Sequence, residues 1–433
     1  MLAPFNLGPY SDTYPISVKQ DVREAAHMMR AVNALRSGHW PSLLGAWLHF
    51  EVSFMGWLLI GALGVPISEA FGLSATQKGL LVAAPLLSGA LLRVVVGLCS
   101  DQYGAKNTGT ALLICELVAV SWGWLGATSY EGVLGTALLL GVAGASFAVA
   151  LPIASYAYPP VHQGLAMGVA AAGNSGTVLA MLFAPRLGQI VGWHGVFGLM
   201  LIPLGLTLLL FLILVQPDRG ISHQERRHGW WESMNTSVSQ RSMYWVSFLY
   251  AVTFGGFVGL CSFLPILLHD QYGVDWVAAG SLTALCGLAG SLIRPIGGYV
   301  ADRFGGLVVL RLVFAWIALC LALAGSLPRL SYAVSYTVLA VGAMGFGNGA
   351  VFQVVSVKFP KQMGIASGIV GAAGGFGGFL LPFCLGALKD MTGTFQSGFW
   401  LFSTVAVIAA ITVGMALQSA ASDAERHPDG FSG

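Results

Sequence analysis

Two arginines, Arg93 and Arg294, lie deep inside long apolar stretches, and each precedes an aspartate, Asp101 or Asp302, by eight residues. At 1.5 Å per helical residue this spacing is about 12 Å, which predicts that both arginines lie at the same depth. A charge at the centre of a membrane span costs at least about 2.5–3.5 kcal/mol, so both side chains should face the protein interior. Two cations that repel each other across a low-dielectric cavity favour an anion between them. The alternative is that an acid of the same half binds each arginine.

The guanidinium group also restricts the shape of that anion. Its planar fork presents paired N–H donors that fit a planar oxyanion, whereas a lysine ammonium is a point charge. Asn174, about ten residues or roughly 15 Å into its predicted helix, offers a neutral amide to the same ligand. Aromatic residues rather than acids are predicted to surround it, with ordinary packing as the alternative for any single ring: Phe50, Phe54, Phe147, Tyr250 and Phe254.

Two acids, Glu51 and Glu116, lie well inside predicted spans. Glu51 is about eight residues into the first span, near the predicted depth of the arginines. We expect it to be a proton acceptor and a counter-ion to Arg93, and the alternative is a residue that snorkels to the membrane surface. For Glu116 we favour a structural role.

The composition indicates that these residues are positioned by membrane-spanning helices. Of the 433 residues, 56% are apolar and only 9% are charged, whereas a soluble domain carries roughly 25% charged residues. The net charge of +2 gives no reason to expect a nucleic-acid partner. The six cysteines lack metal-ligand spacing and are interpreted as buried thiols, so no metal or organic cofactor is expected.

Apolar runs of spanning length predict an all-α membrane protein with twelve transmembrane helices in two six-helix halves. The predicted segments are a cytoplasmic N-terminal segment 1–42, a first half 43–215, a cytoplasmic linker 216–243, a second half 244–418 and a cytoplasmic tail 419–433. With both termini in the cytoplasm, fourteen Lys and Arg lie on that side and four on the other. This bias predicts a multi-pass protein of the cytoplasmic (inner) membrane with both termini inside.

The chain also aligns on itself at an offset of about 200 residues. Arg93, Asp101 and Gly104 then superpose on Arg294, Asp302 and Gly305, while further matches lie in the first, fourth and fifth spans of each half. The two halves are therefore predicted to be one six-helix unit used twice, related by a pseudo-two-fold axis. Parallel halves of this kind place a substrate near the membrane midplane and move it by rocking against each other.

The segments Gly97-Leu-Cys-Ser-Asp101-Gln-Tyr-Gly104 and Gly298-Tyr-Val-Ala-Asp302-Arg303-Phe-Gly305 resemble the loop motif of the major facilitator superfamily. The resemblance covers the whole predicted twelve-span region and implies that Asp101, Asp302 and Arg303 make gating contacts. The first copy has Gln102 where the superfamily usually has arginine.

One glycine-rich span contains Gly164-Leu-Ala-Met-Gly168-Val-Ala-Ala-Ala-Gly173-Asn174-Ser-Gly176, and another contains Gly364-Ile-Ala-Ser-Gly368-Ile-Val-Gly371-Ala-Ala-Gly374-Gly375-Phe-Gly377-Gly378. Together they resemble the paired nitrate signature of the nitrate/nitrite porter family. Small residues allow close approach of transmembrane helices, so these glycines are expected to bring the two spans together and to close the domains. By the same resemblance Arg93 and Arg294 match the family's substrate arginines, and Phe147, Tyr250 and Phe254 match its pocket rings. The signature glycines are Gly164, Gly168, Gly173 and Gly176 in the first copy, and Gly368, Gly371, Gly374, Gly375, Gly377 and Gly378 in the second.

The leading hypothesis is a secondary active transporter that imports nitrate, with nitrite as a second substrate, coupled to protons through Glu51. The alternatives are an exchanger of nitrate for nitrite and, less favoured, an antiporter of small organic oxyanions such as formate or oxalate. An enzyme is disfavoured, because no nucleophile with a base and no metal cluster lies at span depth. The expected partners are nitrate, nitrite, protons and membrane lipid, and the expected functional unit is a monomer.

Overall fold

The computed structural model describes residues 37–159, 162–217, 239–359 and 363–426, and in these ranges the chain is helical with no strand. The linker residues 218–238, the N-terminal residues 1–36 and the last residues 427–433 lie outside the described part, so most of the predicted N-terminal segment and linker do too. The elements are α2 (Trp40–Trp57), α3 (Leu59–Ala62), α4 (Gly64–Phe71), α5 (Ala75–Tyr103), α6 (Ala105–Leu125), α7 (Tyr130–Leu140), η1 (Gly141–Ala145), α8 (Phe147–Tyr156), α9 (Gln163–Ala171), η3 (Ala172–Ser175), α10 (Gly176–Leu214), α12 (Arg241–Tyr250), η4 (Ala251–Gly255), α13 (Gly256–Tyr272), α14 (Trp276–Phe304), α15 (Gly306–Gly325), α16 (Leu330–Lys358), α17 (Met363–Thr392) and α18 (Gln396–Arg426).

Ten helical segments of the described chain are long and apolar enough to cross a membrane. This count differs from the predicted twelve at two places. The first predicted span is interrupted at Leu58 and Leu63, which divide it into α2, α3 and α4. The fifth and sixth predicted spans form one segment, Gln163–Leu214, which turns sharply at Gly192, where φ is 74° and ψ is 162°. Only glycine adopts such a backbone readily, so the turn needs no loop.

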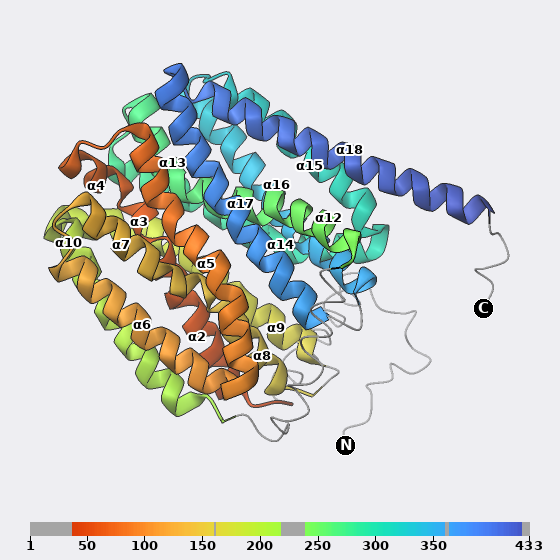
Figure 1. Cartoon of the computed structure of the whole chain (residues 1–433), viewed down its shortest axis with the longest axis horizontal. Helices are drawn as coiled ribbons and strands as arrows, with labels where there is room; N and C mark the ends of the chain where they lie inside the picture. The colour runs from red at the N-terminus through yellow and green to blue at the C-terminus, as the bar shows by residue number, and fades with distance from the viewer. Residues whose placement is uncertain (1–36, 160–161, 218–238, 360–362, 427–433) are drawn as a thin grey trace, which may run out of the picture.

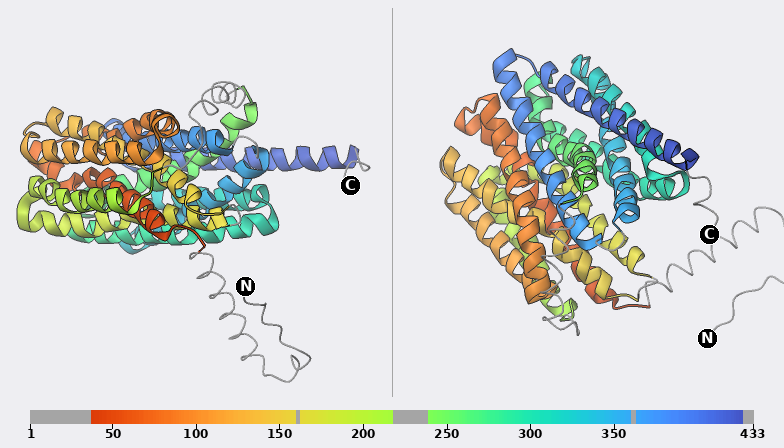
Figure 2. Two further views of the ribbon diagram at one scale, coloured as in Figure 1. Left: turned by 90° about the horizontal axis from the view of Figure 1, so that it is seen from below. Right: turned by 45° about the vertical axis from the view of Figure 1, so that its right-hand side comes forward.

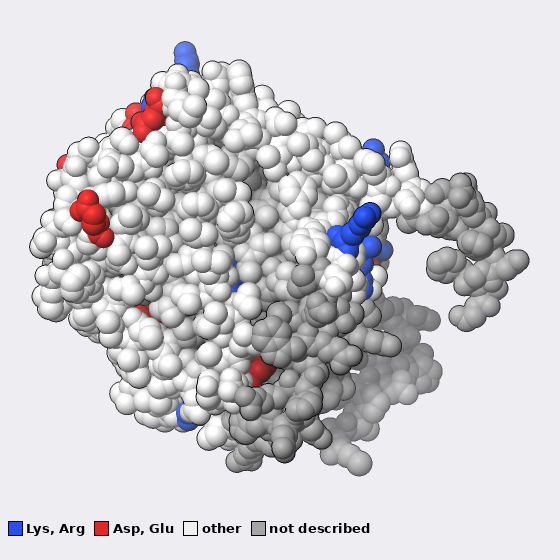
Figure 3. All heavy atoms as spheres, in the orientation of Figure 1, with Lys and Arg blue, Asp and Glu red and all other residues white. Residues whose placement is uncertain are grey.

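The elements form one elongated bundle, and the start of α2 and the last turns of α18 lie toward the same end of it (Figure 1). Helix α18 runs beyond the bundle at that end, which we call the terminal end (Figure 2). The predicted cytoplasmic tail is thus partly helical, because α18 continues to Arg426. The face drawn in Figure 3 has few charged atoms and is uncharged across most of its middle, as a lipid-facing surface must be.

The two sequence halves meet mainly through two helix pairs. Helix α5 packs along α17, and α14 packs along α10. Because the internal repeat relates α5 to α14 and the α9–α10 segment to α17, the two contacts are equivalent under the predicted pseudo-two-fold relation. The equivalent turns agree as well: Gly104 after α5 has φ of 88°, and Gly305 after α14 has φ of 87°.

At the end of the bundle opposite the terminal end, the two halves are in direct contact. We call this the closed end. A Cβ added at Gly386 of α17 would lie 3.2 Å from Cα of Gly79 of α5, and one added at Gly188 of α10 would lie 3.0 Å from the Trp276 ring of α14. Such close approach is possible because glycine has no side chain.

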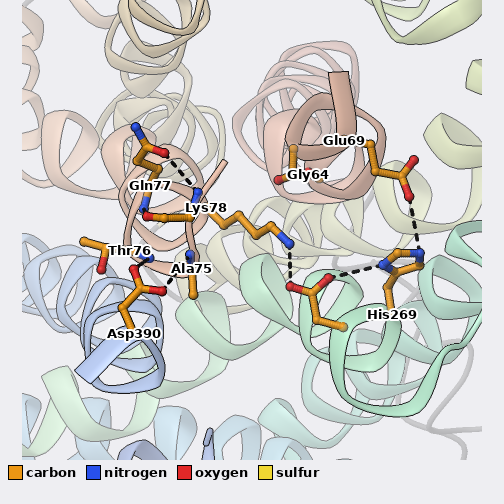
Figure 4. Close-up of polar contacts among 11 residues, drawn as sticks. Gly64, Glu69, Ala75, Thr76, Gln77, Lys78, His269 and Asp390 are labelled. Carbon is orange, nitrogen blue, oxygen red and sulfur yellow. Dashed lines mark hydrogen bonds and ion pairs between the residues drawn. The ribbon is translucent and has the colours of Figure 1, made fainter. Parts of the chain in front are cut away.

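Polar contacts also join the halves at the closed end (Figure 4). The Lys78 ammonium is 2.5 Å from a carboxylate oxygen of Asp270, and the His269 ring is 3.5 Å from the Glu69 carboxylate. The Asp390 carboxylate accepts hydrogen bonds from the backbone N–H groups of Ala75 (3.1 Å) and Thr76 (2.7 Å). Asp390 therefore caps the N-terminus of α5 from the opposite half.

Toward the terminal end, the paired helices separate. Apart from the chain neighbours and the backbone of the same helix, no described atom lies within 4 Å of a Cβ built on Gly97 of α5 or Gly368 of α17, and the same holds for Gly164 and Gly168 of α9. The bundle is thus closed at one end and open between its halves at the other.

Candidate functional site

Arg93 lies at the level where α5 and α17 begin to separate, and only 4% of its surface is exposed. Its Nε donates a hydrogen bond to the carbonyl oxygen of Gly144 at 2.9 Å, and its Nη1 donates to the carbonyl oxygen of Gly371 at 2.6 Å. The guanidinium carbon lies 5.3 Å from the centre of the Trp57 ring and 5.1 Å from that of Phe254. Gly144 and Trp57 belong to the first half, and Gly371 and Phe254 to the second, so Arg93 joins the two.

Two donors are used by these contacts, whereas a guanidinium group has five. The other N–H groups of Arg93 have no hydrogen-bond partner among the described residues, and no carboxylate there pairs with it. The predicted ion pair between Glu51 and Arg93 is therefore not formed in this conformation. A buried guanidinium without a counter-charge leaves a strong preference for an added anion.

Arg294 occupies the equivalent position in the second half. Both α5 and α14 have 29 residues, and Arg93 precedes the last residue of its helix by as many residues as Arg294 does. Arg294 is half-buried, its guanidinium carbon lies 5.8 Å from the Phe352 ring centre, and it interacts with the Tyr250 hydroxyl. Arg93 and Arg294 also repel each other.

The predicted rings Tyr250 and Phe254 lie between the two arginines. They stack with ring centres 5.1 Å apart and an interplanar angle of 3°, and Tyr250 also contacts Phe352 edge-on at 5.1 Å. Phe254 faces Arg93 while Tyr250 interacts with Arg294, so this stack is in contact with both cations. Two further predicted rings, Phe147 and Phe50, contact each other in the first half with their ring centres 5.8 Å apart. No contact of Phe147 with either arginine is seen.

The backbone is irregular where these residues lie. The carbonyl that accepts from Arg93 belongs to η1, a 3₁₀ turn, and Asn174 belongs to η3, another 3₁₀ turn. Phe254 lies in η4, a π-helical turn that follows Tyr250 directly. Such turns inside transmembrane helices free backbone groups from the helical ladder and are frequent at functional sites. Two of these turns, η1 and η4, interrupt their spans at residues that contact Arg93.

Asn174 is 3% exposed, and its side-chain carbonyl oxygen has no hydrogen-bond partner in the described part of the chain. Glu51 lies beside this turn: its carboxylate accepts a hydrogen bond of 2.7 Å from the Ser175 hydroxyl, and only 5% of its surface is exposed. Glu51 and Asn174 are thus brought together, although the sequence placed them on different spans. Glu116 is fully buried on α6, and neither of its carboxylate oxygens has a hydrogen-bond partner among the residues that the structure describes.

The signature glycines have partners different from the predicted ones. A Cβ at Gly173 would lie 2.9 Å from Phe50, and one at Gly176 would lie 2.8 Å from the backbone nitrogen of Met55, so the first copy packs on α2. In the second copy a Cβ at Gly374 would lie 2.7 Å from the Tyr250 ring, and one at Gly375 would lie 2.8 Å from Ala90 of α5. The tight contacts of each glycine-rich span are therefore with a ring-bearing or arginine-bearing neighbour.

The remaining signature glycines either contact a neighbouring segment or lie at the open end. A Cβ at Gly377 would lie 2.9 Å from Ala251 Cα, one at Gly378 would lie 2.8 Å from Val258, and one at Gly371 would lie 3.8 Å from Nη1 of Arg93. Gly164, Gly168 and Gly368 border the open end instead. The gating-motif residues lie there too: Asp101, Asp302 and Arg303 are exposed at the ends of α5 and α14, and Arg303 contacts the ring of its neighbour Phe304.

Three site residues were missed by the sequence analysis: Trp57, Phe352 and Asn348. Trp57 could have been found, since the repeat that matches Phe50 and Phe54 to Tyr250 and Phe254 continues one turn further to Phe257. Asn348 of α16 is 1% exposed with an unpartnered carbonyl oxygen, and a Cβ at the adjacent Gly347 would contact Thr253 of η4. No pattern in the sequence points to Phe352.

The arrangement is suited to holding a small anion. It combines two arginines of like charge, unused N–H donors on one of them, flat aromatic walls and a buried amide, and it has no acid against either guanidinium in the described part of the chain. A site of this kind binds and releases an oxyanion without chemical change.

Comparison with known proteins identifies the class. The sequence model of the Major Facilitator Superfamily matches residues 46–382. Among solved structures, a D-xylose-proton symporter superposes with a TM-score of 0.70 at 18% identity, covering 86% of this chain and 97% of that one. A bacterial homolog of the human lysosomal transporter Spinster superposes with a TM-score of 0.68 at 20% identity, covering 87% and 96%.

Curated relatives are more similar in sequence. The "nitrite extrusion protein" of Bacillus subtilis is 31% identical over 367 residues, covering 84% of this chain and 91% of that protein. The "probable nitrate/nitrite transporter NarK2" of Mycobacterium tuberculosis is 34% identical over 378 residues, covering 85% and 93%. The "probable nitrate/nitrite antiporter NarK1" of Thermus thermophilus is 32% identical over 392 residues, covering 84% and 88%. The chain therefore belongs to the nitrate/nitrite porter family of the major facilitator superfamily and is a multi-pass membrane transporter.

Proposed function

We propose that this protein carries nitrate, and nitrite as a second substrate, across the cytoplasmic membrane by alternating access. The observation that carries the proposal is Arg93, a buried guanidinium with unused donors, at the same depth as Arg294 of the other half. The printed names of the relatives support these substrates. In the proposed complex the planar anion lies between the arginines and against the Tyr250 and Phe254 rings, and Asn174 adds an amide contact.

The orientation is part of the proposal. With both termini in the cytoplasm, as the distribution of Lys and Arg favours, the open terminal end faces the cytoplasm and the closed end faces outward. The conformation described here is then the inward-facing one, from which nitrate leaves into the cell. Closure of the terminal end would bring the Gly164, Gly168 and Gly368 surfaces and the gating residues Asp101, Asp302 and Arg303 into contact across the halves.

For the energy source we favour proton coupling. Nitrate that enters a negative cell interior moves uphill by about 2.3 kcal/mol per 100 mV, so net uptake needs at least two protons with each anion or an anion in exchange. Glu51 is the proposed proton site, because its carboxylate lies beside Asn174 and has one hydroxyl partner, Ser175. In the outward-facing state, the ionised carboxylate would approach Arg93, and protonation would release the arginine for nitrate.

Exchange of nitrate for nitrite is the second candidate. It is favoured by one observation: neither arginine contacts an acid in the described residues, so one-for-one exchange could proceed without any titrating group. An exchanger would also be electroneutral.

The test uses purified full-length protein in liposomes that contain no exchangeable anion. Under an inward proton gradient, we expect accumulation of nitrate, weaker accumulation of nitrite, and none of formate or oxalate. Glu51→Gln should reduce gradient-driven uptake at least tenfold, whereas the matched control Glu116→Gln, another buried carboxyl, should not. Uptake only when nitrite is enclosed would establish exchange instead of symport. Gradient-driven uptake that survives Glu51→Gln would exclude Glu51 as the proton site.

A further inference from the structure

A groove of about 660 Å³ lies on the outer surface of the second half, away from the arginine site. It runs between α15 and α18, two helices that pack side by side. On α15 its lining residues recur at helical spacing from Arg311 to Ala322, and on α18 from Ser403 to Gln418. The helices are antiparallel, so Arg311 lies opposite Gly414 and Gln418 at one end of the groove, and Ala322 lies opposite Ser403 at the other.

Small side chains create the groove. Ala315, Ala318 and Ala322 on α15 and Ala410 and Gly414 on α18 leave space between the two helices. The walls of this channel are completed by larger apolar residues: Leu319, Val407, Ile411 and Met415. At the Ser403 end of the groove the helices are joined, because the Ser403 hydroxyl donates a hydrogen bond of 2.7 Å to the carbonyl oxygen of Ala318. At the opposite end of the groove, the two helices diverge around the Arg311 side chain.

Arg311 is the one cation of the lining, which contains no acid. Its side chain is exposed, and it has no ion pair or hydrogen bond with any residue that the structure describes. A Cβ added at Gly414 would lie 3.5 Å from its Nε and 3.6 Å from its guanidinium carbon. Gly414 thus gives the guanidinium a position over the mouth of the groove with its donors unused.

The length of the groove matches one leaflet of a bilayer. From Arg311 to Ala322 the helix rises about 16 Å, and half of a hydrocarbon core of about 30 Å is roughly 15 Å. Arg311 follows the turn at Gly305 by less than two helical turns, so its long side chain can reach the membrane surface at the terminal end. An apolar groove one leaflet deep with a cation at the surface is complementary to a single lipid with an anionic headgroup.

We propose that this groove is a binding site for an anionic phospholipid of the terminal-end leaflet. The phosphate accepts hydrogen bonds from Arg311 and from the Gln418 amide, while an acyl chain lies along the alanine-lined channel toward Ser403. Because α15 and α18 both belong to the second half and lie outside the α5–α17 and α10–α14 contacts, the lipid moves with that half during transport. The site is independent of the anion substrate.

The test is native mass spectrometry of the purified full-length protein with added phosphatidylglycerol or phosphatidylcholine of the same acyl chains. The wild type should retain one phosphatidylglycerol at least tenfold more tightly than phosphatidylcholine. Arg311→Gln should remove this preference, while Arg329→Gln, a control arginine at the closed end of the same half, should keep it. Gly414→Leu should lower the affinity for both lipids, since the added side chain fills the mouth of the groove, and Ala410→Leu is the second variant should Gly414→Leu fold poorly.

Equal affinity of the wild type for both lipids, or an unchanged preference in Arg311→Gln, would overturn the proposal. A second arm adds inorganic phosphate: displacement of phosphatidylglycerol by millimolar phosphate would show that the arginine binds the free anion and not a lipid. Nitrate binding should be the same in Arg311→Gln and the wild type, so failure of the lipid site leaves the proposed transport function untouched.

Discussion

The two central arginines have the same helical position but different surroundings. Arg93 is buried and already bonded to carbonyls of both halves, whereas Arg294 is half-buried and interacts with Tyr250. The N–H donors of Arg294 are therefore more accessible than those of Arg93. An anion that enters from the open end should contact Arg294 first and the remaining N–H groups of Arg93 afterwards.

Replacing either arginine by lysine should separate charge from shape. A lysine keeps the positive charge but removes the paired donors, so loss of a charge-assisted hydrogen bond of about 1.5–3 kcal/mol predicts a 10- to 100-fold weaker affinity for nitrate. The affinities of Arg93→Lys and Arg294→Lys would be measured by isothermal titration, with Arg329→Lys as the control. Nitrate affinity within twofold of the wild type in both variants would contradict bidentate binding.

Much of the site was predictable from single residues, and the reason is energetic. A charge inside an apolar span is costly, so Arg93 and Arg294 stand out without any structure, and their shared depth follows from the repeat. The partners were less predictable. Hydrogen bonds to the Gly144 and Gly371 carbonyls depend on backbone turns and on contacts across the halves, which no local pattern records. The roles of Asn174 and Glu51 in binding and coupling remain predictions.

At the scale of helices, the glycine-rich spans show how one pattern serves different contacts. The sequence predicted close approach of helices at these small residues, and a Cβ added at Gly374, Gly375 or Gly173 would lie within 3 Å of a neighbouring segment. In this conformation these glycines pack against α2, η4 and α5 and not against each other. Glycine spacing indicates that another helix packs closely at these positions, but which helix it is depends on the packing of the whole bundle.

The two kinds of glycine should respond differently to a bulky replacement. Gly374→Leu places atoms against the Tyr250 and Phe254 rings, so we expect nitrate affinity to fall at least tenfold, because the rings between the arginines are displaced. Gly368→Leu enters open space in this conformation, so binding should be retained, while transport should stop because the terminal end can no longer close. Titration of nitrate in detergent and uptake by liposomes measure the two effects separately.

Two results would refute this division. One is wild-type nitrate affinity in a folded Gly374→Leu variant, and the other is loss of binding in Gly368→Leu with uptake reduced in proportion. Gly72, which has φ of 61° and no neighbour within 4 Å in the described structure, should not be used as a control, since any side chain there strains the backbone itself.

For the molecule as a whole, the polar contacts of the closed end set the balance between conformations. Lys78 with Asp270 and Asp390 with the N-terminus of α5 join the halves, and exposed contacts of this kind contribute up to about 1 kcal/mol each. We expect Lys78→Ala combined with Asp390→Ala to raise the outward-open fraction several-fold. The control is Lys389→Ala, whose ammonium bonds Gly393 of its own half.

Spin labels at Ser129 and Arg329 in a cysteine-free background would report this shift, because the two residues are exposed at the closed end on opposite halves. The double variant should populate a longer distance between the labels that is rare in the wild type. An unchanged distance distribution would mean that glycine-mediated packing alone holds the closed end. The sequence could not have predicted these contacts, since their partners are far apart along the chain.

The hydrogen bonds from Arg93 to Gly144 and Gly371 have a further consequence for the transport cycle. These carbonyl oxygens partly occupy the place of a substrate, so an unloaded protein does not hold a bare charge in its centre. When carbonyl oxygens bond Arg93, the unloaded carrier can change between its inward-facing and outward-facing states without substrate. The free-energy barrier to that change is lower than in a carrier whose arginines are left unsolvated. An obligatory exchanger must forbid that return, because an empty return would dissipate the gradient that it exploits. The carbonyl pair therefore favours a cycle with net flux, and it makes the rate of empty return, rather than substrate affinity, the step at which symporters and exchangers of this fold should differ.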